Sequence, residues 1–267
     1  MNLLLWFQAF LQGIVEGLTE FLPISSTGHM IILNHFFPME NPVFAQKFEV
    51  IIQLGAILSV LVCFYQKILP KRWNIDGFVQ IFPLWIRIVV GVLPAAVIGL
   101  ICHDFIEEKL FNPLVVAVAL IVWGIVLIFT KRLEANSSKK VTAIDKMAYW
   151  QIICVGFSQC LAMIPGTSRS AVTIIAAISL GCTRACAAEF SFFLAIPTMF
   201  GAALLTLVKG GMAFSSAEWY ALGIGFATAF FTAWGVIAWF MTYVKKHDFS
   251  LFGWYRIVLG MILLILL

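Results

Sequence analysis

The stretch EGLTEFLPISSTGH, residues 16–29, decides the fold because it puts a polar, proline-containing loop inside an apolar segment of about residues 3–37. A proline ends a helix at or before the preceding residue, so this segment is predicted to form two short helices around the loop. The stretch MIPGTSRS, residues 163–170, interrupts the apolar segment 150–180 in the same way. Two helical hairpins with polar tips are therefore expected.

The composition places these hairpins in a membrane. Of the 267 residues, 62% are hydrophobic and 11% are charged. A soluble domain is about 45–50% apolar and about 25% charged, so the apolar excess is too large for one folded core. Irregular backbone at membrane depth is stable only inside protein or beside a wet cavity, because lipid cannot satisfy its amides and carbonyls. We therefore expect both hairpins to be re-entrant.

Six further segments have the roughly 20 mostly apolar residues that a membrane-spanning helix needs. They are residues 44–65, 82–102, 111–130, 188–208, 217–243 and 250–267. The predicted fold class is an all-α polytopic membrane protein with six transmembrane helices and two re-entrant helical hairpins.

The two halves of the chain resemble each other. A shift of 142 residues aligns FLPISS at 21–26 with MIPGTS at 163–168, and a shift of 140 aligns EVIIQLGAI at 49–57 with EFSFFLAIP at 189–197. Each half then holds one hairpin and three spans. Because three spans is an odd number, the second half enters the membrane from the opposite side, so the halves form an inverted-topology repeat. Short matches between apolar segments also arise by chance, so the repeat is a hypothesis. The predicted units are one integral membrane domain, 1–267, with repeat halves of about 1–140 and 141–267.

The basic residues predict the orientation, since Lys and Arg collect in the cytoplasmic loops of membrane proteins. If the N-terminus is outside, three basic residues lie on the outer side, namely Lys47, Lys109 and Lys209. The cytoplasmic loops then hold Lys67, Lys71, Arg72, Lys131, Arg132, Lys139, Lys140, Lys146, Arg184, Lys245 and Lys246. Both termini are therefore predicted outside. This bias also explains the net charge of +4, so no nucleic-acid partner is expected.

Ionisable residues at membrane depth cost about 2.5–3.5 kcal/mol each on insertion scales, so they indicate functional sites. Glu16 and Glu20 are four residues apart and share one face of the first hairpin helix. The first hairpin offers Glu16, Glu20, Ser25, Ser26, Thr27 and His29. The second offers Thr167, Ser168, Arg169, Ser170 and Thr173.

These residue types together are typical of phosphate chemistry. Arginine donates a planar fork to phosphate oxygens, and a hydroxyl that opens a half-helix brings backbone amides to the same anion. Two neighbouring carboxylates bind a divalent cation or supply a base. The structural alternative is that the hydroxyls allow close helix packing and a Glu–Arg pair neutralises buried charge. For five further polar residues two interpretations are equally open: they line the same cavity, or they pair with each other within the bundle. These residues are Glu49, Gln53, Glu189, Arg87 and Arg256.

Residues 16–29 and the stretch PGTSRSAVT at 165–173 resemble motifs of the bacterial undecaprenyl-diphosphate phosphatases, membrane enzymes linked to bacitracin resistance. The resemblance extends over the whole chain and includes FEVIIQLGAI at 48–57 and AAEFSFFLAIP at 187–197. One position departs from the family pattern, which commonly has glycine after SRS where this chain has Ala171. No functional group is lost by that change.

The resemblance implies hydrolysis of undecaprenyl diphosphate to undecaprenyl phosphate, the lipid carrier for peptidoglycan synthesis, on the periplasmic side of the bacterial inner membrane. The catalytic residues that it implies are Glu16, Glu20, Ser26 and His29. The phosphate-binding residues that it implies are Ser168, Arg169, Ser170 and Thr173, and the hydroxyl loop adds Ser25 and Thr27. A divalent cation, Mg²⁺ or Ca²⁺, is associated with the activity of the family, and Glu16 and Glu20 are its expected ligands.

Several questions stay open at the level of the sequence. An anion carrier or a flippase for the lipid monophosphate also fits broken helices in an inverted repeat. The attacking group is water, Ser26 or His29. Because no neighbour of Ser26 in the sequence is an obvious base, we expect metal-assisted attack by water with His29 as general acid. The sequence does not indicate whether the protein forms a homodimer.

Overall fold

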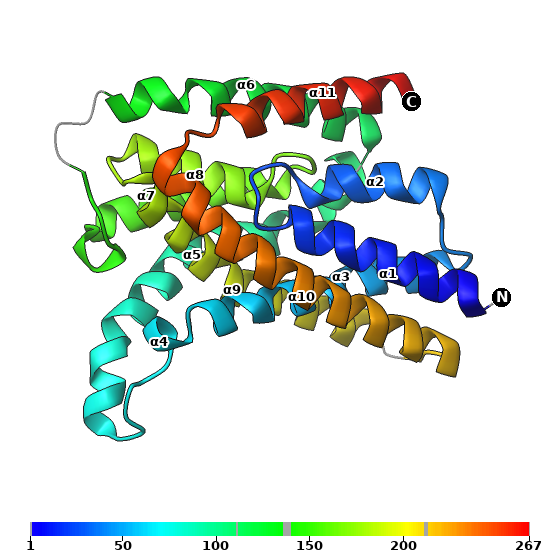
Figure 1. The fold of residues 1–267 in the computed structure, drawn as a ribbon, viewed down its shortest axis with the longest axis horizontal. Helices are drawn as coiled ribbons and strands as arrows, with labels where there is room; N and C mark the ends of the chain where they lie inside the picture. The colour runs from blue at the N-terminus through cyan, green and yellow to red at the C-terminus, as the bar shows by residue number, and fades with distance from the viewer. Residues whose placement is uncertain (1, 111, 136–139, 211–212, 267) are drawn as a thin grey trace.

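The computed structural model describes residues 2–110, 112–135, 140–210 and 213–266, and these residues form α-helices, two 3₁₀ helices and no β-strand (Figure 1). The α-helices are α1 (Asn2–Thr19), α2 (Ser26–Phe36), α3 (Pro42–Cys63), α4 (Tyr65–Ile68), α5 (Ile75–Leu110), α6 (Pro113–Ala135), α7 (Tyr149–Gln159), α8 (Arg169–Ser179), α9 (Arg184–Gly210), α10 (Ser216–Lys246) and α11 (Ser250–Leu266). The 3₁₀ helices are η1 (Ile144–Lys146) and η2 (Cys160–Met163). The expected all-α class is confirmed.

In the described part of the chain, five helices are long and apolar enough to cross a membrane, namely α3, α5, α6, α9 and α10. They carry large apolar side chains on their outer surfaces; Leu100 and Ile101 of α5, for example, are 71% and 77% exposed. Such exposure is stable in lipid and costly in water. The chain is therefore a multi-pass membrane protein. The predicted sixth span is the shorter apolar helix α11, which has 17 described residues and precedes residue 267, outside the described part.

Helix α5 extends beyond the predicted span 82–102 at both ends, and it runs unbroken through Pro83 and Pro94 inside that span. Prolines are tolerated inside membrane helices where neighbouring elements satisfy the freed backbone groups. Helix α5 lies tightly against α7 at this point, since a Cβ added to Gly156 would be 2.5 Å from the carbonyl oxygen of Gly91. The rule that a proline ends a helix therefore holds at the two polar loops and fails inside α5.

The two apolar segments with polar loops each form two helices that turn back on themselves (Figure 1). The first pair is α1 and α2, joined by residues 20–25. The second pair is α7 and α8, joined through η2 and residues 164–168. Their turns meet inside the molecule, where the Ser170 hydroxyl donates to the Leu22 carbonyl at 2.9 Å.

The helix ends fall on two sides of the molecule. Both ends of the chain and the α2–α3 connection lie toward the right in Figure 1, whereas α4 and the described part of the α6–α7 connection, residues 140–148, lie toward the left. Two of the basic residues predicted to be cytoplasmic lie in these left-hand segments, namely Lys67 in α4 and Lys146 in η1. Lys139 lies outside the described residues, as does the side chain of Lys209.

Helices α6 and α11 pack along each other at very short range. Glycines allow this approach, because a Cβ on Gly124 would be 2.8 Å from the Gly253 carbonyl oxygen and one on Gly260 would be 2.8 Å from that of Ala117. Backbones that approach so closely gain dispersion contacts where lipid offers no hydrophobic driving force between helices. Helix α11 is thereby fixed beside α6, and its inner face reaches both turns.

Replacement of Gly253 by alanine should lower the melting temperature, because the new Cβ would lie 2.7 Å from the carbonyl oxygen of Gly124. Overpacking of this kind costs about 1–3 kcal/mol. Gly235→Ala in α10 is the matched control, since no described atom lies within 4 Å of a Cβ at that position. Thermal unfolding of both variants in one detergent checks the prediction, and equal melting temperatures would contradict it.

Candidate active site

Glu20 directly follows α1, and its carboxylate faces the first residue of α2. The Ser26 hydroxyl donates a hydrogen bond to Glu20 Oε2 at 2.7 Å. The position of Ser26 is set by the cap of α2, where Ser25 Oγ accepts from the backbone N–H of Gly28 at 3.4 Å. A serine is a preferred residue at such a helix start. The turn thus holds a hydroxyl against a carboxylate.

The second turn has the same construction. Ser168 caps α8 by accepting from the backbone N–H of Ala171 at 3.3 Å. The backbone angles of the two caps also match, with φ 69° and ψ 100° at Ser25 and φ 71° and ψ 112° at Ser168. Non-glycine residues rarely adopt positive φ, and each such residue costs about 1–3 kcal/mol. Two strained turns of this kind at the centre of the molecule indicate a functional site.

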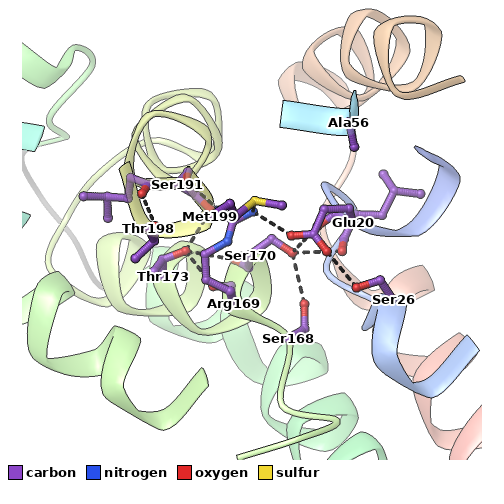
Figure 2. A network of polar contacts seen from close by, with 12 residues as sticks. Glu20, Ser26, Ala56, Ser168, Arg169, Ser170, Thr173, Ser191, Thr198 and Met199 are labelled. Carbon is purple, nitrogen blue, oxygen red and sulfur yellow. Dashed lines mark hydrogen bonds and ion pairs between the residues drawn. The ribbon is translucent and has the colours of Figure 1, made fainter. Parts of the chain in front are cut away.

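Arg169 joins the two turns, as Figure 2 shows. Its Nη2 lies 3.1 Å from Glu20 Oε1, and both side chains are largely buried, with exposed fractions of 13% and 11%. The other nitrogen, Nη1, donates to the carbonyl of Ser191 in α9 at 2.8 Å. Glu20 therefore binds Ser26 through one oxygen and Arg169 through the other.

Ser170 and Thr173 support this arrangement from behind. Ser170 Oγ donates to Leu22 O in the first turn and lies 3.0 Å from Ser168 Oγ. Thr173 Oγ1 lies 2.7 Å from Ser191 Oγ and donates to the carbonyl of Arg169 at 2.8 Å. Both side chains are buried and neither lines the cavity described next. The structure therefore places these two predicted residues beside the turns and off the cavity wall, where their hydroxyls hold the turns.

A cavity of about 430 Å³ opens beside the two turns. Six of the ten predicted site residues line it, namely Glu20, Ser25, Ser26, Thr27, Ser168 and Arg169. Its other walls come from Gln53, Ala95, Gly99, Gln159, Ala162, Met163, Pro165, Gly166, Thr198, Met199 and Ala202. The cavity therefore combines a charged and hydroxylated floor with walls of small and apolar side chains.

His29 and Glu16 do not line the cavity. His29 Nδ1 lies 2.7 Å from the Ser25 carbonyl oxygen, so this nitrogen carries the proton, and Nε2 lies 2.7 Å from the Tyr255 hydroxyl. The His29 and Tyr255 rings are also stacked. Glu16 is buried one helical turn before Glu20, and its Oε1 has no hydrogen-bond partner among the described residues. Neither side chain therefore forms part of the cavity wall.

Gln159 is a cavity residue that the sequence reasoning missed. It is the last residue of α7, it is buried, and neither polar atom of its amide has a partner among the described residues. A buried amide without partners is costly, so this side chain is poised to bind a ligand in the cavity. The signal in the sequence was a polar residue just before the second hairpin loop, close to the place that Glu16 has in the first under the shift of 142 residues.

The four charged residues that the sequence left open make hydrogen bonds or ion pairs within the bundle. Glu49 accepts from Asn34 at 2.7 Å, and Glu189 forms an ion pair with Lys67 at 2.7 Å. The hydrogen bonds of the Arg87 and Arg256 guanidinium groups are to backbone carbonyls. Of the residues left open by the sequence, Gln53 lines the cavity and Glu49, Glu189, Arg87 and Arg256 do not.

The site offers oxygen donors for a hard divalent cation. The Glu20 carboxylate and the Ser25 and Ser26 hydroxyls line the cavity, whereas the buried Glu16 carboxylate does not. In the described part of the chain, no group of three or more His, Cys, Asp or Glu residues is placed to hold a metal. Mg²⁺ commonly binds through one or two carboxylates together with substrate phosphates. The donors therefore fit a cation that a phosphate ligand helps to hold, with Glu20 as the protein carboxylate.

Fold and site together define a multi-pass membrane protein with an internal Arg–Glu–Ser site between two broken helices. The chain belongs to the family of the bacitracin resistance protein BacA, whose model matches residues 9–262. It is 52% identical over 260 residues to an undecaprenyl-diphosphatase of Fusobacterium nucleatum, covering 96% of this chain and 98% of the relative. It is 47% identical over 266 residues to undecaprenyl-diphosphatase 1 of Clostridioides difficile, covering 98% and 96%.

Proposed function

We propose that this chain hydrolyses undecaprenyl diphosphate to undecaprenyl phosphate and inorganic phosphate, and so recycles the lipid carrier for cell-wall synthesis. The observation that carries the proposal is the Glu20 carboxylate, held between the Ser26 hydroxyl and the Arg169 guanidinium on the cavity floor. This set combines a nucleophile, a base and a cation for a phosphate. The names of relatives that match nearly the whole chain support the same reaction.

The proposed architecture has six transmembrane helices and two re-entrant hairpins, α1–α2 and α7–α8, in an inverted repeat with halves of about 1–140 and 141–267. The matching caps of α2 and α8 support the repeat and suggest a shift of 143 residues for the turns, one more than the sequence comparison indicated. We place the protein in the bacterial inner membrane. The basic left-hand segments then face the cytoplasm, and both termini and the site face the periplasm.

Arg169 binds the terminal phosphate in this mechanism. The transition state of phosphoryl transfer is loose, with charge spread over the phosphate oxygens, so catalysis consists mainly of positioning and charge stabilisation. The guanidinium fork suits two of these oxygens. The backbone amides that begin α2 and α8 point to the same anion from two half-helices. Thr27 and the amide of Gln159, both on the cavity wall, add neutral donors.

The attacking group in our proposal is Ser26. From the sequence we expected water, because no base was obvious next to Ser26. The Ser26 hydroxyl donates to Glu20 at 2.7 Å, so that reason does not hold. Oγ attacks the terminal phosphorus while Glu20 takes its proton, and the bond to the bridging oxygen breaks. Glu20 releases this proton to cavity water. In the second step Glu20 takes a proton from the water that attacks the phosphoserine phosphorus, the Ser26 Oγ–P bond breaks, and Glu20 passes that proton to Ser26 Oγ, which regenerates the serine and leaves inorganic phosphate.

The leaving group in the first step is undecaprenyl phosphate, whose phosphate oxygen is a stable anion. A general acid is therefore not required, and the expectation that His29 protonates the leaving oxygen has no geometric support, because His29 lies off the cavity. We propose that His29 instead fixes the Ser25 carbonyl, with Tyr255 holding its other nitrogen. A divalent cation, Mg²⁺ or Ca²⁺, bound by Glu20 and by the substrate, would supply charge neutralisation.

The test of the function is phosphate release by the purified protein in detergent, with undecaprenyl diphosphate and no ion gradient. We expect multiple turnovers. An anion carrier or a flippase has only to bind its cargo and would release no phosphate under these conditions. A preparation that binds the lipid without hydrolysing it would therefore favour transport and contradict the proposal.

Arg169→Lys should lower kcat/KM by roughly 10²–10³-fold, the usual effect of losing one donor to a transition-state anion. Lysine keeps the positive charge but cannot bridge Glu20 and Ser191 and donate a fork to phosphate. Expression and melting temperature should stay near those of the wild type. Phosphate release at the wild-type rate would refute the assignment.

Glu20→Gln and Ser26→Ala should each reduce kcat by roughly 10²–10⁴-fold, because one removes the base and the other the nucleophile. Saturating Mg²⁺ should not restore Glu20→Gln. A single turnover of the wild type with labelled substrate should place label on Ser26. His29→Ala alters a residue off the cavity, so it should lower kcat less than Ser26→Ala does. A larger fall in kcat for His29→Ala than for Ser26→Ala, with no label on Ser26, would instead favour direct attack by water.

Cysteine labelling tests the orientation. In a background without the six native cysteines, an impermeant reagent added to spheroplasts should modify a cysteine placed at Glu40, between α2 and α3. It should leave a cysteine at Lys71, between α4 and α5, unmodified until the membrane is opened. Both native side chains are exposed, so access depends on the side of the membrane. Labelling of position 71 alone would mean that the site faces the cytoplasm.

A further inference from the structure

Arg256 on α11 is fully buried, with an exposed fraction of 0%. Its hydrogen bonds among the described residues go to backbone carbonyl oxygens, not to carboxylates. The acceptors are Pro23 (3.2 Å, from Nη1), Gly166 (2.8 Å), Thr167 (3.0 Å) and Ala119 (3.5 Å, all from Nη2), and Leu120 (3.4 Å, from Nε). One guanidinium thus connects α11 to α6 and to both turns of the candidate site.

The carbonyls that Arg256 binds in the two turns occupy corresponding places. Pro23 lies two residues before the cap Ser25, and Gly166 lies two residues before the cap Ser168. Nη1 binds the first carbonyl and Nη2 the second. The guanidinium fork places two separate nitrogens at these two acceptors, whereas a lysine ammonium would have to reach both carbonyls from one nitrogen. The guanidinium therefore sets how far apart the two turns stand.

This spacing matters because the first residues after the caps carry the chemistry. Ser26 follows Ser25 and Arg169 follows Ser168, and these two side chains bind the two oxygens of Glu20 at 2.7 and 3.1 Å. The caps have strained positive φ angles, which persist only where surrounding contacts hold them. Arg256 holds the backbone of each turn two residues before its cap.

The charge of Arg256 also bears on the site. The Arg169 charge is offset by Glu20, whereas the Arg256 charge faces carbonyl dipoles. Gly166 lines the cavity, and its carbonyl oxygen is 2.8 Å from Arg256 Nη2, so this charge lies directly behind the cavity wall. In an apolar interior such a charge attracts an anion at longer range than in water.

We propose that Arg256 is a positioning residue for the phosphatase reaction. Its fork holds the two turns in register, and its charge, which lies behind the cavity wall, favours binding of the diphosphate in the cavity. The proposal rests on the proposed function and adds a residue that does not line the cavity. The two parts of the role separate experimentally, because lysine keeps the charge and loses the fork, whereas methionine loses both.

The test measures kcat, KM and melting temperature for Arg256→Lys and Arg256→Met with undecaprenyl diphosphate in detergent. Arg256→Lys should lower kcat by about 30-fold, or ~2 kcal/mol at 1.36 kcal/mol per tenfold, with KM near that of the wild type. Arg256→Met should lower kcat similarly and also raise KM about 10-fold. Leu263→Ala, two helical turns along α11 and equally buried, is the packing control. It should lower the melting temperature and leave both constants within about 3-fold.

The outcomes separate the two proposals. A wild type that releases no phosphate means that the proposed function fails. An active wild type together with normal kcat and KM for Arg256→Lys overturns the positioning role. If neither Arg256 variant folds while Leu263→Ala does, Arg256 is needed for folding alone and the positioning role is likewise overturned. A fall in kcat for a folded Arg256→Lys, with KM raised only by methionine, supports the proposal.

Discussion

Backbone groups that a broken helix leaves without partners must be satisfied inside an apolar interior, and this constraint organises the centre of the molecule. Two helices are interrupted, after Thr19 and after Gln159. Water is scarce at that depth, so side chains take its place. The caps Ser25 and Ser168 accept from amides, while Ser170 and Arg256 donate to carbonyls of the turns. The polar residues at the breaks are thus needed to satisfy the backbone, whatever further role they have in the site.

The same constraint explains why the candidate site lies where it does. A half-helix that begins in the interior directs its first amides into open space, where an anion satisfies them. Two such half-helices, α2 and α8, begin beside one cavity. The side chain of the first residue of each, Ser26 and Arg169, binds the Glu20 carboxylate. Small residues such as Gly99 and Ala202 on the other walls leave room for a ligand. The architecture that satisfies the broken backbone therefore also builds the candidate site.

Much of this was predictable from the sequence, and the limits have physical causes. Apolar runs and prolines located the helices and both turns, and Glu20, Ser26 and Arg169 stood out as polar groups in apolar surroundings. The pairing of Arg169 with Glu20 joins residues 149 positions apart, and the bond from Arg256 to Pro23 joins residues 233 apart. No local pattern reports such contacts. His29 carried the right chemistry for catalysis, yet the helical phase of α2 turns it toward Tyr255.

The buried ion pair between Arg169 and Glu20 has a consequence for the end of a catalytic cycle. Because Arg169 already has a carboxylate partner, a phosphate that binds to it competes with Glu20, and binding is an exchange of partners in a low-dielectric medium. A diphosphate with several negative oxygens competes better than the singly or doubly charged phosphate that remains after hydrolysis. In the proposed mechanism, the return of Arg169 to Glu20 would then favour release of the product. An arginine without that partner would hold inorganic phosphate more tightly and slow the next turnover.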